Sequence, residues 1–221
     1  MFPSRVIIAG ATGLVGSKLT SMMAGSPAVN EVKVVTRRPT GLMGSSINEI
    51  HVDFDRLADS ADKFDADVAY CCLGTTMKNA GSKEAFFRVD HDYVVEFATL
   101  VHRAGVRRFY VITAMGADEK STFYYNRVKG ETEKDLRQIG FAELHILRPS
   151  LLLGDRKESR PGESFGQFIM TRLSFLLAGP LKKYRPIRDI TVARAMIFLS
   201  ERHTNGIFVH NSEEIQKLGK A

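Results

Sequence analysis

The sequence is poor in cysteine, and the two cysteines that it has are adjacent. Cys71 and Cys72 lie in an apolar run of a chain of 221 residues. Neighbouring residues of a strand point to opposite faces, so this pair is a poor candidate for a disulfide. A chain of this length can bury a sizeable core without disulfide or metal staples. The cysteine usage therefore indicates a reducing compartment.

Long apolar runs and a leader segment are also missing. The longest apolar stretches fall far short of the roughly 20 residues that a membrane-spanning helix needs. No basic opening segment is followed by an apolar run, which is the pattern of a secretory signal peptide. We therefore expect a soluble, cytoplasmic protein without a membrane span.

The sequence also lacks the patterns of several function classes. No GxSxG motif is present, so a serine hydrolase is not supported. The net charge of +6 reflects either ordinary surface composition or an attraction for phosphate-bearing ligands. The basic residues are spread along the chain without a compact nucleic-acid motif, so we expect no nucleic-acid partner. Metal binding is not expected either, because ligand-like spacing is absent around the histidines at 51, 91, 102, 145, 203 and 210.

Strand-like runs and helical patterns alternate along the first 150 residues. Apolar residues at three-to-four spacing predict helices over 14–24, 91–103 and 122–139. This alternation is typical of a parallel sheet covered by helices on both faces, so we expect an α/β fold with a doubly wound, Rossmann-like sheet. The predicted strands are Arg5–Ala9, Glu31–Thr36, Glu49–Val52, Val68–Leu73, Arg108–Thr113 and Glu143–Leu147.

The pattern changes after Pro149. A polar, turn-rich loop is predicted over Gly154–Ser164, helices over Phe165–Ala178 and Thr191–Ser200, and a strand over Gly206–Val209. We expect residues from about 150 onward to form a small substrate-side cap. We expect the whole chain, 1–221, to form a single domain.

The stretch VIIAGATGLVG, residues 6–16, places three glycines directly after the first strand. In this position Gly10 allows a tight turn, Gly13 allows a phosphate to approach the backbone, and Gly16 allows the helix to pack on the strand. The helix dipole then favours the negative charge of a pyrophosphate. We expect a dinucleotide to bind at Gly10, Thr12, Gly13, Leu14, Val15 and Gly16.

Two arginines follow the second predicted strand. An NAD-selective site commonly has an acid here, which accepts a hydrogen bond from the ribose 2′-hydroxyl. This chain has Arg37 and Arg38 instead, and guanidinium groups pair with a 2′-phosphate in a forked geometry. The sequence therefore predicts NADP(H), with NAD(H) as the less favoured cofactor.

The segment YNRVK contains a tyrosine and a lysine four residues apart. On a helix, this spacing puts Tyr125 and Lys129 on one face. A lysine cation can lower the pKa of the tyrosine and bind ribose hydroxyls, and the tyrosine can exchange a proton with a carbonyl or alcohol.

Together these motifs resemble the short-chain dehydrogenase/reductase superfamily in its atypical branch. The chain is most similar to the Tat-interacting-protein family of metastasis-suppressor-like oxidoreductases and their bacterial relatives. The matching stretches span most of residues 6 to 164 and are GATGLVG, the DFD of Asp53–Asp55, GADEKSTFYYNRVKGETE and LRPSLLLGDRKESRPGE.

The resemblance implies roles for further residues. Asp53 and Phe54 would lie beside the adenine. Pro149 to Leu152 would approach the nicotinamide carboxamide. The stretch RPIRDITVARAM resembles the segment that closes the substrate side in extended members, although Arg188 and Ile190 depart from its usual acidic core. Three residues at the end of the fourth strand would pass under the adenine ribose, namely Leu73, Gly74 and Thr75.

One position departs from the superfamily pattern. A Ser or Thr hydroxyl usually follows the fifth strand and polarises the substrate carbonyl. Here the stretch is VITAMGAD, and Thr113 is its only hydroxyl. The register can also place Ala114 or Met115 in that slot, in which case one oxyanion-stabilising donor is missing, at a cost of around a hundredfold in rate.

Two functions follow from these residues. In the first, the chain is an NADP(H)-dependent oxidoreductase for an unidentified small carbonyl or alcohol, with Tyr125, Lys129 and Thr113 as catalytic residues. In the second, it is a cofactor-loaded regulatory or partner-binding module with little or no catalysis. A homodimer is also considered, because the predicted helix 91–103 carries a surplus of apolar residues, with core packing as the alternative for Tyr93, Phe97 and Leu100.

Overall fold

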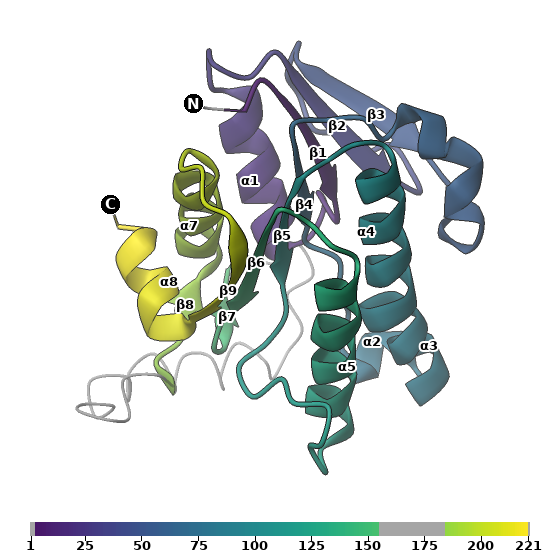
Figure 1. The fold of residues 1–221 in the computed structure, drawn as a ribbon, viewed down its shortest axis with the longest axis vertical. Helices are drawn as coiled ribbons and strands as arrows, with labels where there is room; N and C mark the ends of the chain where they lie inside the picture. Colours follow the sequence, from purple (N-terminus) through teal and green to yellow (C-terminus); the bar gives the residue numbers. More distant parts are fainter. Residues whose placement is uncertain (1–2, 155–183, 221) are drawn as a thin grey trace.

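The computed structural model describes residues 3–154 and 184–220 (Figure 1). A seven-stranded sheet runs through the middle of the molecule, in the order β3-β2-β1-β4-β5-β6-β9, and every neighbouring pair is parallel. The order reverses between β1 and β4, and ligands of open α/β sheets bind beside this point, at the carboxyl ends of the strands. The strands are β1 Arg5–Ala9, β2 Glu31–Thr36, β3 Ile47–His51, β4 Val68–Cys71, β5 Arg108–Ile112, β6 Glu143–Arg148 and β9 Gly206–Asn211.

Helices cover both faces of this sheet (Figure 1). One face carries α1 Leu14–Ala24, α7 Asp189–Ser200 and α8 Ser212–Leu218, and the other carries α4 Tyr93–Arg103 and α5 Tyr124–Gln138. Leu152–Leu153 (β7) and Ile187–Arg188 (β8) form a separate two-stranded pair. The remaining short helices are the 3₁₀-helix η1 Phe54–Lys63, α2 Met77–Ala80, α3 Lys83–Phe87 and the π-helix η2 Arg88–Asp92.

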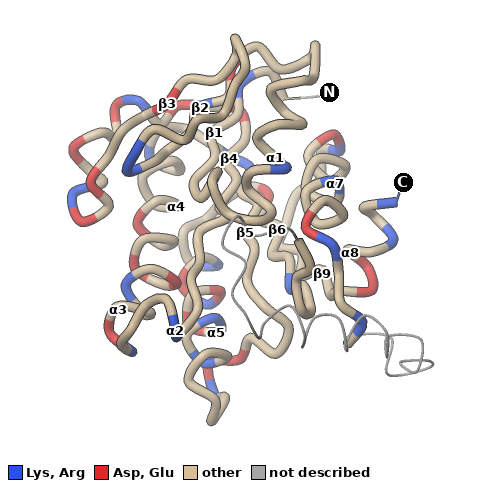
Figure 2. The backbone as a smooth tube through the Cα atoms, turned by 180° about the vertical axis from the view of Figure 1, so that it is seen from behind, with Lys and Arg blue, Asp and Glu red and all other residues tan. Residues whose placement is uncertain are grey.

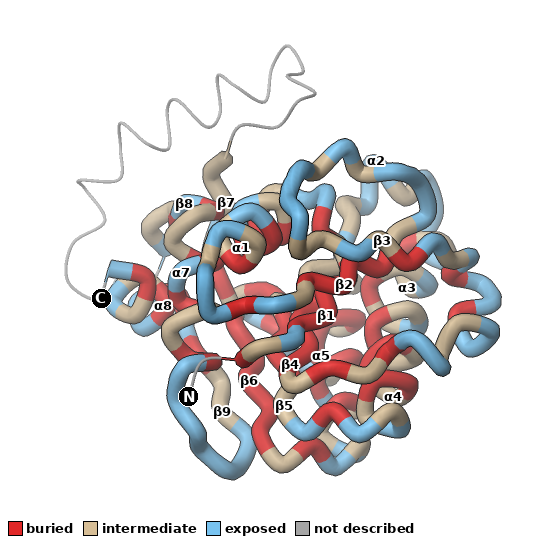
Figure 3. Tube along the Cα trace, turned by 90° about the horizontal axis from the view of Figure 1, so that it is seen from above, coloured by how far each residue is buried: buried red, intermediate tan, exposed pale blue. Residues whose placement is uncertain are grey.

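Alternate residues of the central strands fill two separate cores. On β1, Ile7 and Ala9 face the core under α4 and α5, whereas Val6 and Ile8 face the core under α1 and α7. All four are fully buried, and Figure 3 shows the buried strands enclosed by helices with exposed outer faces. Burial on both faces explains why these strands read as continuous apolar runs.

The expected α/β fold is confirmed, and its first elements have the predicted bounds. The structure adds η1, α2 and α3, which the sequence did not predict, and the helix predicted over 91–103 begins within the π-helix η2 and continues as α4. Helices α2 and α3 have only four and five residues, and η1 is interrupted by non-helical backbone at Arg56, so these three elements lack the sustained periodicity on which a helix prediction rests.

Core packing accounts for the apolar residues of α4. Phe97 is fully buried between Phe64 and Phe109, and Leu100 is buried in the same core. The hydroxyl of Tyr93 donates to Asp55 at 2.7 Å. The surplus apolar surface that suggested a homodimer is therefore used within the chain, so it gives no support to an interface.

The described residues after 183 join the main body of the fold. Strand β9 pairs along its length with β6, and α7 packs on α1 and α8. The predicted loop and helix over 154–164 and 165–178 lie, apart from Gly154, outside the described residues, and the substrate-side cap therefore stays a prediction.

Charged residues lie mainly on the helices and loops around the strands (Figure 2). Within the described ranges, the structure contains no cluster of three or more His, Cys, Asp or Glu side chains with the arrangement of a metal site. None of the helices described here is long and apolar enough to cross a bilayer.

Candidate cofactor site and active site

The glycine loop lies where β1 meets the end of β4. Gly10 has a φ of +83°, and a Cβ placed on it would lie 2.5 Å from the carbonyl carbon and oxygen of Cys72. A Cβ on Gly16 would lie 2.1 Å from the carbonyl oxygen of Gly10. Gly10 thus supplies a left-handed turn and a close backbone approach, and Gly16 lets α1 pack directly on that turn.

The first turn of α1 is open to an anion. Gly13 occupies the N-cap without a side-chain hydrogen bond, and no acidic residue lies in the first turn. The amide groups there have no intrahelical acceptor, and the positive end of the helix dipole adds to their attraction for phosphate. Thr12 is exposed, Leu14 is half-buried, and Val15 is buried against the sheet. These residues fit the pyrophosphate of a dinucleotide.

Arg37 and Arg38 follow β2 and are both exposed. The Thr36 hydroxyl donates to the carbonyl oxygen of Arg38 at 2.8 Å, which fixes the backbone of this turn. No carboxylate of the described residues forms an ion pair with either arginine. Both guanidinium groups are therefore available to a ligand at this edge.

Asp53 and Phe54 lie at the beginning of η1. The Asp53 carboxylate caps this helix by accepting from the amide of Asp55 at 3.0 Å. Phe54 is buried, and its ring lies 5.3 Å from that of Tyr93. In this structure the Phe54 side chain is part of the core, and Asp53 is the exposed member of the pair.

The chain that follows β4 lies beside Lys129. A Cβ on Gly74 would lie 3.7 Å from Lys129 Nζ and 3.3 Å from Asp90 Oδ1. Lys129 Nζ forms a 2.7 Å ion pair with Asp90, and both side chains are almost completely buried. The second carboxylate oxygen of Asp90 accepts from the amide of Thr75 at 2.8 Å. Leu73 is half-buried beside them.

Tyr125 lies one turn before Lys129 on α5. Its ring packs 5.5 Å from that of Phe86, and the residue is 38% exposed. Burial raises the pKa of Tyr125, the Lys129 cation lowers it, and the Asp90 carboxylate raises it, with a net result above the ordinary value. Tyr125 is therefore protonated at neutral pH.

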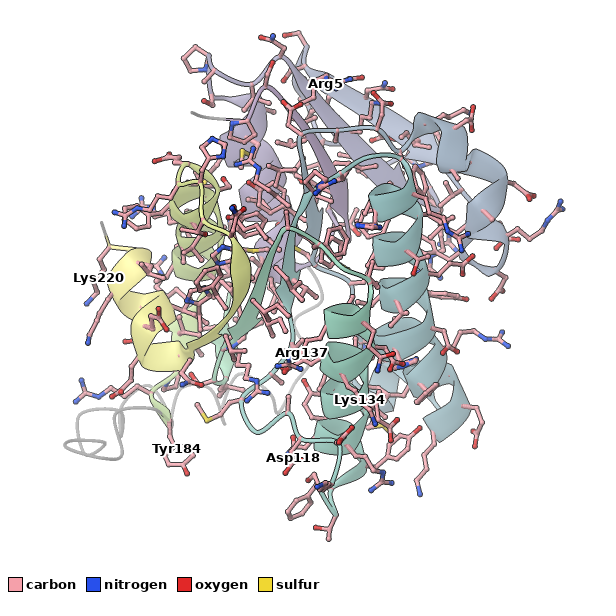
Figure 4. All side chains as sticks on the ribbon, in the orientation of Figure 1. Arg5, Asp118, Lys134, Arg137, Tyr184 and Lys220 are labelled. Carbon is pink, nitrogen blue, oxygen red and sulfur yellow. The ribbon has the colours of Figure 1, made fainter. Side chains whose placement is uncertain are left out.

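The single hydroxyl after β5 is engaged by a buried carboxylate. Thr113 Oγ1 donates to Glu133 Oε1 at 2.7 Å, and Thr113 is 6% exposed. Glu133 also accepts two hydrogen bonds from Arg148, Nε at 2.8 Å and Nη2 at 2.6 Å, and one from Arg137 at 3.1 Å. The hydroxyl hydrogen of Thr113 is thus already donated within the protein. Figure 4 shows Arg137 and Lys134 on α5, and Asp118 in the loop before this helix.

The residues after β6 also lie at the carboxyl edge of the sheet. Pro149 is buried, and its carbonyl oxygen accepts from the amide of Met115 at 2.9 Å. Leu152 pairs with Ile187 in the small sheet. A Cβ on Gly154 would lie 2.3 Å from Asp189 Oδ2 and 3.0 Å from Leu14 Cδ2. The chain after β6 therefore returns to the beginning of α1.

Sequence reasoning missed four residues around the candidate site, namely Asp90, Glu133, Arg148 and Gly130. Glu133 continues the four-residue spacing of Tyr125 and Lys129, which was an available signal. A Cβ on Gly130 would lie 2.1 Å from the amide nitrogen of Glu119, so Gly130 lets the preceding loop pack on α5. Asp90 is followed two residues later by Asp92 in the sequence DHD, and no local pattern separates these two acids.

The sheet order, the glycine loop and the open helix define a dinucleotide-binding α/β protein. A protein family described as NAD(P)H-binding matches residues 10–169, and the chain belongs to this family. It is an atypical short-chain dehydrogenase/reductase related to the protein HTATIP2, whose Rattus norvegicus form is 40% identical over 162 residues. This match covers 72% of the chain and 66% of the rat protein.

Fungal relatives match over nearly the whole chain. "Protein FMP52, mitochondrial" of Candida albicans is 32% identical over 227 residues, which are 97% of both chains. "Protein fmp52, mitochondrial" of Emericella nidulans is 29% identical over 222 residues, covering 97% of this chain and 95% of that protein. These names overturn the expectation of a cytoplasmic protein. The expectation was wrong because a low cysteine count indicates a reducing environment and does not select one compartment.

Solved structures agree on the fold. MoeE5, determined with UDP-glucuronic acid and NAD, has a TM-score of 0.70 at 20% identity, over 93% of this chain and 75% of that one. The UDP-N-acetylglucosamine 4-epimerase of Methanobrevibacter ruminantium has a TM-score of 0.71 at 14% identity, over 100% of this chain and 81% of that one. At these identities the likeness supports the NAD-binding fold alone.

Proposed function

We propose that the chain is an NADP(H)-dependent oxidoreductase that interconverts a small carbonyl compound and the corresponding alcohol. Tyr125 exchanges the proton, and Lys129 holds the ribose hydroxyls of the cofactor and tunes Tyr125. The nicotinamide, when bound, supplies or accepts the hydride.

One juxtaposition carries this proposal. A Cβ on Gly10 would clash with the backbone of Cys72 and Leu73, and a Cβ on Gly74, next along the chain, would contact the Asp90–Lys129 pair. The phosphate-binding turn and the Tyr–Lys face of α5 thus meet at the end of one strand, β4. A cofactor whose pyrophosphate lies at α1 can extend past this strand to Tyr125.

Proton transfer is assigned to Tyr125. In the direction of carbonyl reduction, the Tyr125 hydroxyl donates its hydrogen to the carbonyl oxygen as that oxygen gains negative charge. Burial and the Asp90 carboxylate raise the pKa of Tyr125 and outweigh the Lys129 cation, which lowers it, so Tyr125 keeps its proton at neutral pH. In the reverse direction the tyrosinate accepts the hydroxyl proton of the alcohol.

Thr113 is not assigned a direct contact with substrate in this proposal. Its hydroxyl hydrogen is directed at Glu133, and the side chain is buried. The residues that follow, Ala114 and Met115, have no hydroxyl. Tyr125 is then the one protonated side-chain donor assigned to the substrate oxygen, and turnover is expected to be slow compared with a site that has two donors.

The preference for NADP(H) is proposed from the turn after β2. Thr36 ends this strand without an acid, and Arg37 and Arg38 are exposed beside it. A 2′-phosphate would receive charge-assisted hydrogen bonds from these guanidinium groups.

The test is a panel of carbonyl compounds and alcohols, followed by cofactor absorbance, in wild type, Tyr125→Phe and Tyr124→Phe. The Tyr124 hydroxyl donates to the carbonyl oxygen of Lys83, so the neighbouring substitution makes the same chemical change away from the proposed proton transfer. We expect Tyr125→Phe to lower kcat at least about a hundredfold with cofactor affinity kept, and Tyr124→Phe to retain turnover.

Tight NADPH binding without turnover on a broad panel, and without any effect of Tyr125→Phe, would contradict this proposal. That result is the one expected of a regulatory module, whose cofactor occupancy controls association with a partner. Equal loss of activity in both tyrosine variants would also count against a specific role of Tyr125.

A further inference from the structure

Asp90 is held in place by three elements. It lies in η2, the π-helical turn Arg88–Asp92, and is 1% exposed. Its backbone carbonyl oxygen accepts from the Thr132 hydroxyl of α5 at 3.0 Å, and its carboxylate accepts from the Thr75 amide after β4. The other carboxylate oxygen is 2.7 Å from Lys129 Nζ. A π-helical turn inside a helical segment is often found at a functional site.

The ion pair gives Lys129 a counter-charge inside the protein. Burial lowers the pKa of Lys129, but the charge of Asp90, the neighbouring Tyr125 and the hydrogen bond to Asp90 outweigh burial and raise it. Lys129 is therefore a cation at every pH at which the protein is expected to work. Its charge is also balanced, so Tyr125 experiences a cation and a carboxylate together.

We propose that Asp90 is a positioning residue that directs Lys129 toward the end of β4 and balances the Lys129 charge beside Tyr125. This inference rests on the proposed function for its consequence in catalysis. The positioning of Lys129 by Asp90 does not depend on the proposed function, because all contacts of Asp90 are formed within the protein itself.

The groups that face Tyr125 come from four elements. Lys129 lies on the same helix, Asp90 lies on η2, the Phe86 ring packs from α3, and Cys71 on β4 faces the Lys129–Asp90 pair. Burial raises the pKa of the Cys71 thiol to about 12, so it stays neutral over the range of interest. Replacing the Asp90 carboxylate by an amide therefore removes the single negative charge of this set.

The experiment follows Tyr125 directly, in protein labelled with ¹³C at the tyrosine ζ-carbon. The chain has six tyrosines, and Tyr125→Phe identifies the resonance. Burial moves the pKa of Tyr70 and of Tyr110 far upward and that of Tyr93 to about 12, so these three remain protonated during most of the titration. The shift of the Tyr125 carbon against pH then gives its ionisation midpoint without any need for turnover.

We expect Asp90→Asn to lower the Tyr125 midpoint by about one pH unit, which is about tenfold more tyrosinate at a fixed pH, because an unbalanced cation is left beside the ring. The midpoint of Tyr124, one residue away on the helix surface, should not move. If turnover is found, the corresponding limb of the pH–rate profile should move in the same direction. An unchanged or higher Tyr125 midpoint would overturn the inference.

A double variant guards against misfolding of the single one. Asp90→Asn combined with Lys129→Met removes both charges, and replacing both partners of a buried ion pair is often neutral for stability. If Asp90 balances Lys129, the Tyr125 midpoint of the double variant stays within about half a pH unit of wild type. A rise of the Tyr125 midpoint by more than about one pH unit would show that the Lys129 charge is not balanced in the wild type. That result would overturn the inference.

These outcomes separate the inference from the proposed function. A lowered Tyr125 midpoint in Asp90→Asn, without turnover on any substrate, supports the role of Asp90 and contradicts the oxidoreductase. Turnover that depends on Tyr125, with a midpoint that Asp90→Asn does not change, supports the oxidoreductase and contradicts the role of Asp90.

Discussion

Gly10 illustrates how a single residue is fixed by two separate constraints. Its positive φ disfavours any residue with a Cβ, and the backbone of Cys72 leaves no space for that atom. Gly41 shares the first constraint, with a φ of +67°, but has open space around it. The two glycines can therefore separate backbone strain from steric clash.

We predict that Gly10→Ala destabilises the protein by about 3 kcal/mol or more, since about 1–2 kcal/mol arises from the left-handed backbone and the rest from overpacking. Gly41→Ala is the matched control and should lower the free energy of unfolding only by the part that arises from the left-handed backbone. Urea denaturation of both variants gives the two free energies of unfolding. Similar losses in the two variants would show that the contact with Cys72 does not constrain the loop.

A second prediction at this scale concerns the proposed cofactor preference. Arg37→Ala should weaken NADPH binding about tenfold or more and leave NADH binding unchanged, because a 2′-phosphate loses a charge-assisted partner. Calorimetric titration of both cofactors measures this, with Arg103→Ala, an exposed arginine at the end of α4, as the control. Equal affinity of the wild type for the two cofactors would remove the basis of the NADP(H) assignment.

At the scale of elements, α5 joins the two halves of the site. Tyr125, Lys129 and Glu133 recur every four residues, so they form one stripe along the helix. Each meets a different partner, namely Phe86 on α3, Asp90 on η2 and Thr113 after β5. The position of the helix against the sheet, and hence of Tyr125, depends on all three contacts.

The contact at Glu133 gives a prediction for this element. Glu133→Gln should destabilise the protein by about 3 kcal/mol, because the completely buried carboxylate accepts from Arg148, Arg137 and Thr113. Thermal unfolding measures the loss. Lys134→Ala, the next residue on the helix and part of an exposed ion pair with Glu119, should leave stability near that of wild type. A Glu133→Gln variant as stable as wild type would show that this network does not hold α5.

At the scale of the whole molecule, the parallel sheet gathers distant parts of the sequence. The first turn of α1, the turn after β2, and the ends of β4, β5 and β6 all lie at its carboxyl edge. A polar chain runs from β6 through β9 to α8, in which His145 contacts Glu143 at 2.9 Å and His210 at 2.8 Å, and His210 contacts the half-exposed Glu214 at 2.9 Å. The Tyr110 and Phe208 rings stack on His145, and Thr204 lies beside it.

This chain predicts a pH dependence of global stability. Burial and the neighbouring His210, only partly offset by Glu143 and Glu214, lower the pKa of His145 from 6.5 to about 4. The unfolded chain therefore binds a proton that the folded chain does not between these pH values, so stability falls as pH falls through this window. His145 contributes up to about 1.4 kcal/mol per pH unit.

Urea denaturation between pH 4 and pH 7 measures this slope. His145→Gln should flatten it, whereas His203→Gln, a change at an exposed histidine, should leave it unchanged. A wild-type slope that persists in His145→Gln would assign the dependence to other groups.

The sequence by itself determined two kinds of feature. These are the strands and helices whose apolar pattern extends over many consecutive residues, and the glycine turn, which depends only on neighbouring residues. Strand β1, helix α1 and strand β2 have their predicted bounds, because apolar runs and a helical stripe are recorded in consecutive residues. The spacing of Gly10, Gly13 and Gly16 likewise indicates a turn that only glycine can form. The pairing of Tyr125 with Lys129 follows from helix geometry alone.

Only the tertiary structure decided which side chains those residues meet. Lys129 and Asp90 are 39 positions apart, and their ion pair exists because η2 and α5 pack on the same face of the sheet. The direction of the Thr113 hydroxyl depended on whether a carboxylate lay within reach, and Glu133 supplies one from another element. A sequence pattern records neighbours within a helix or strand, whereas contacts between elements depend on packing over the whole fold.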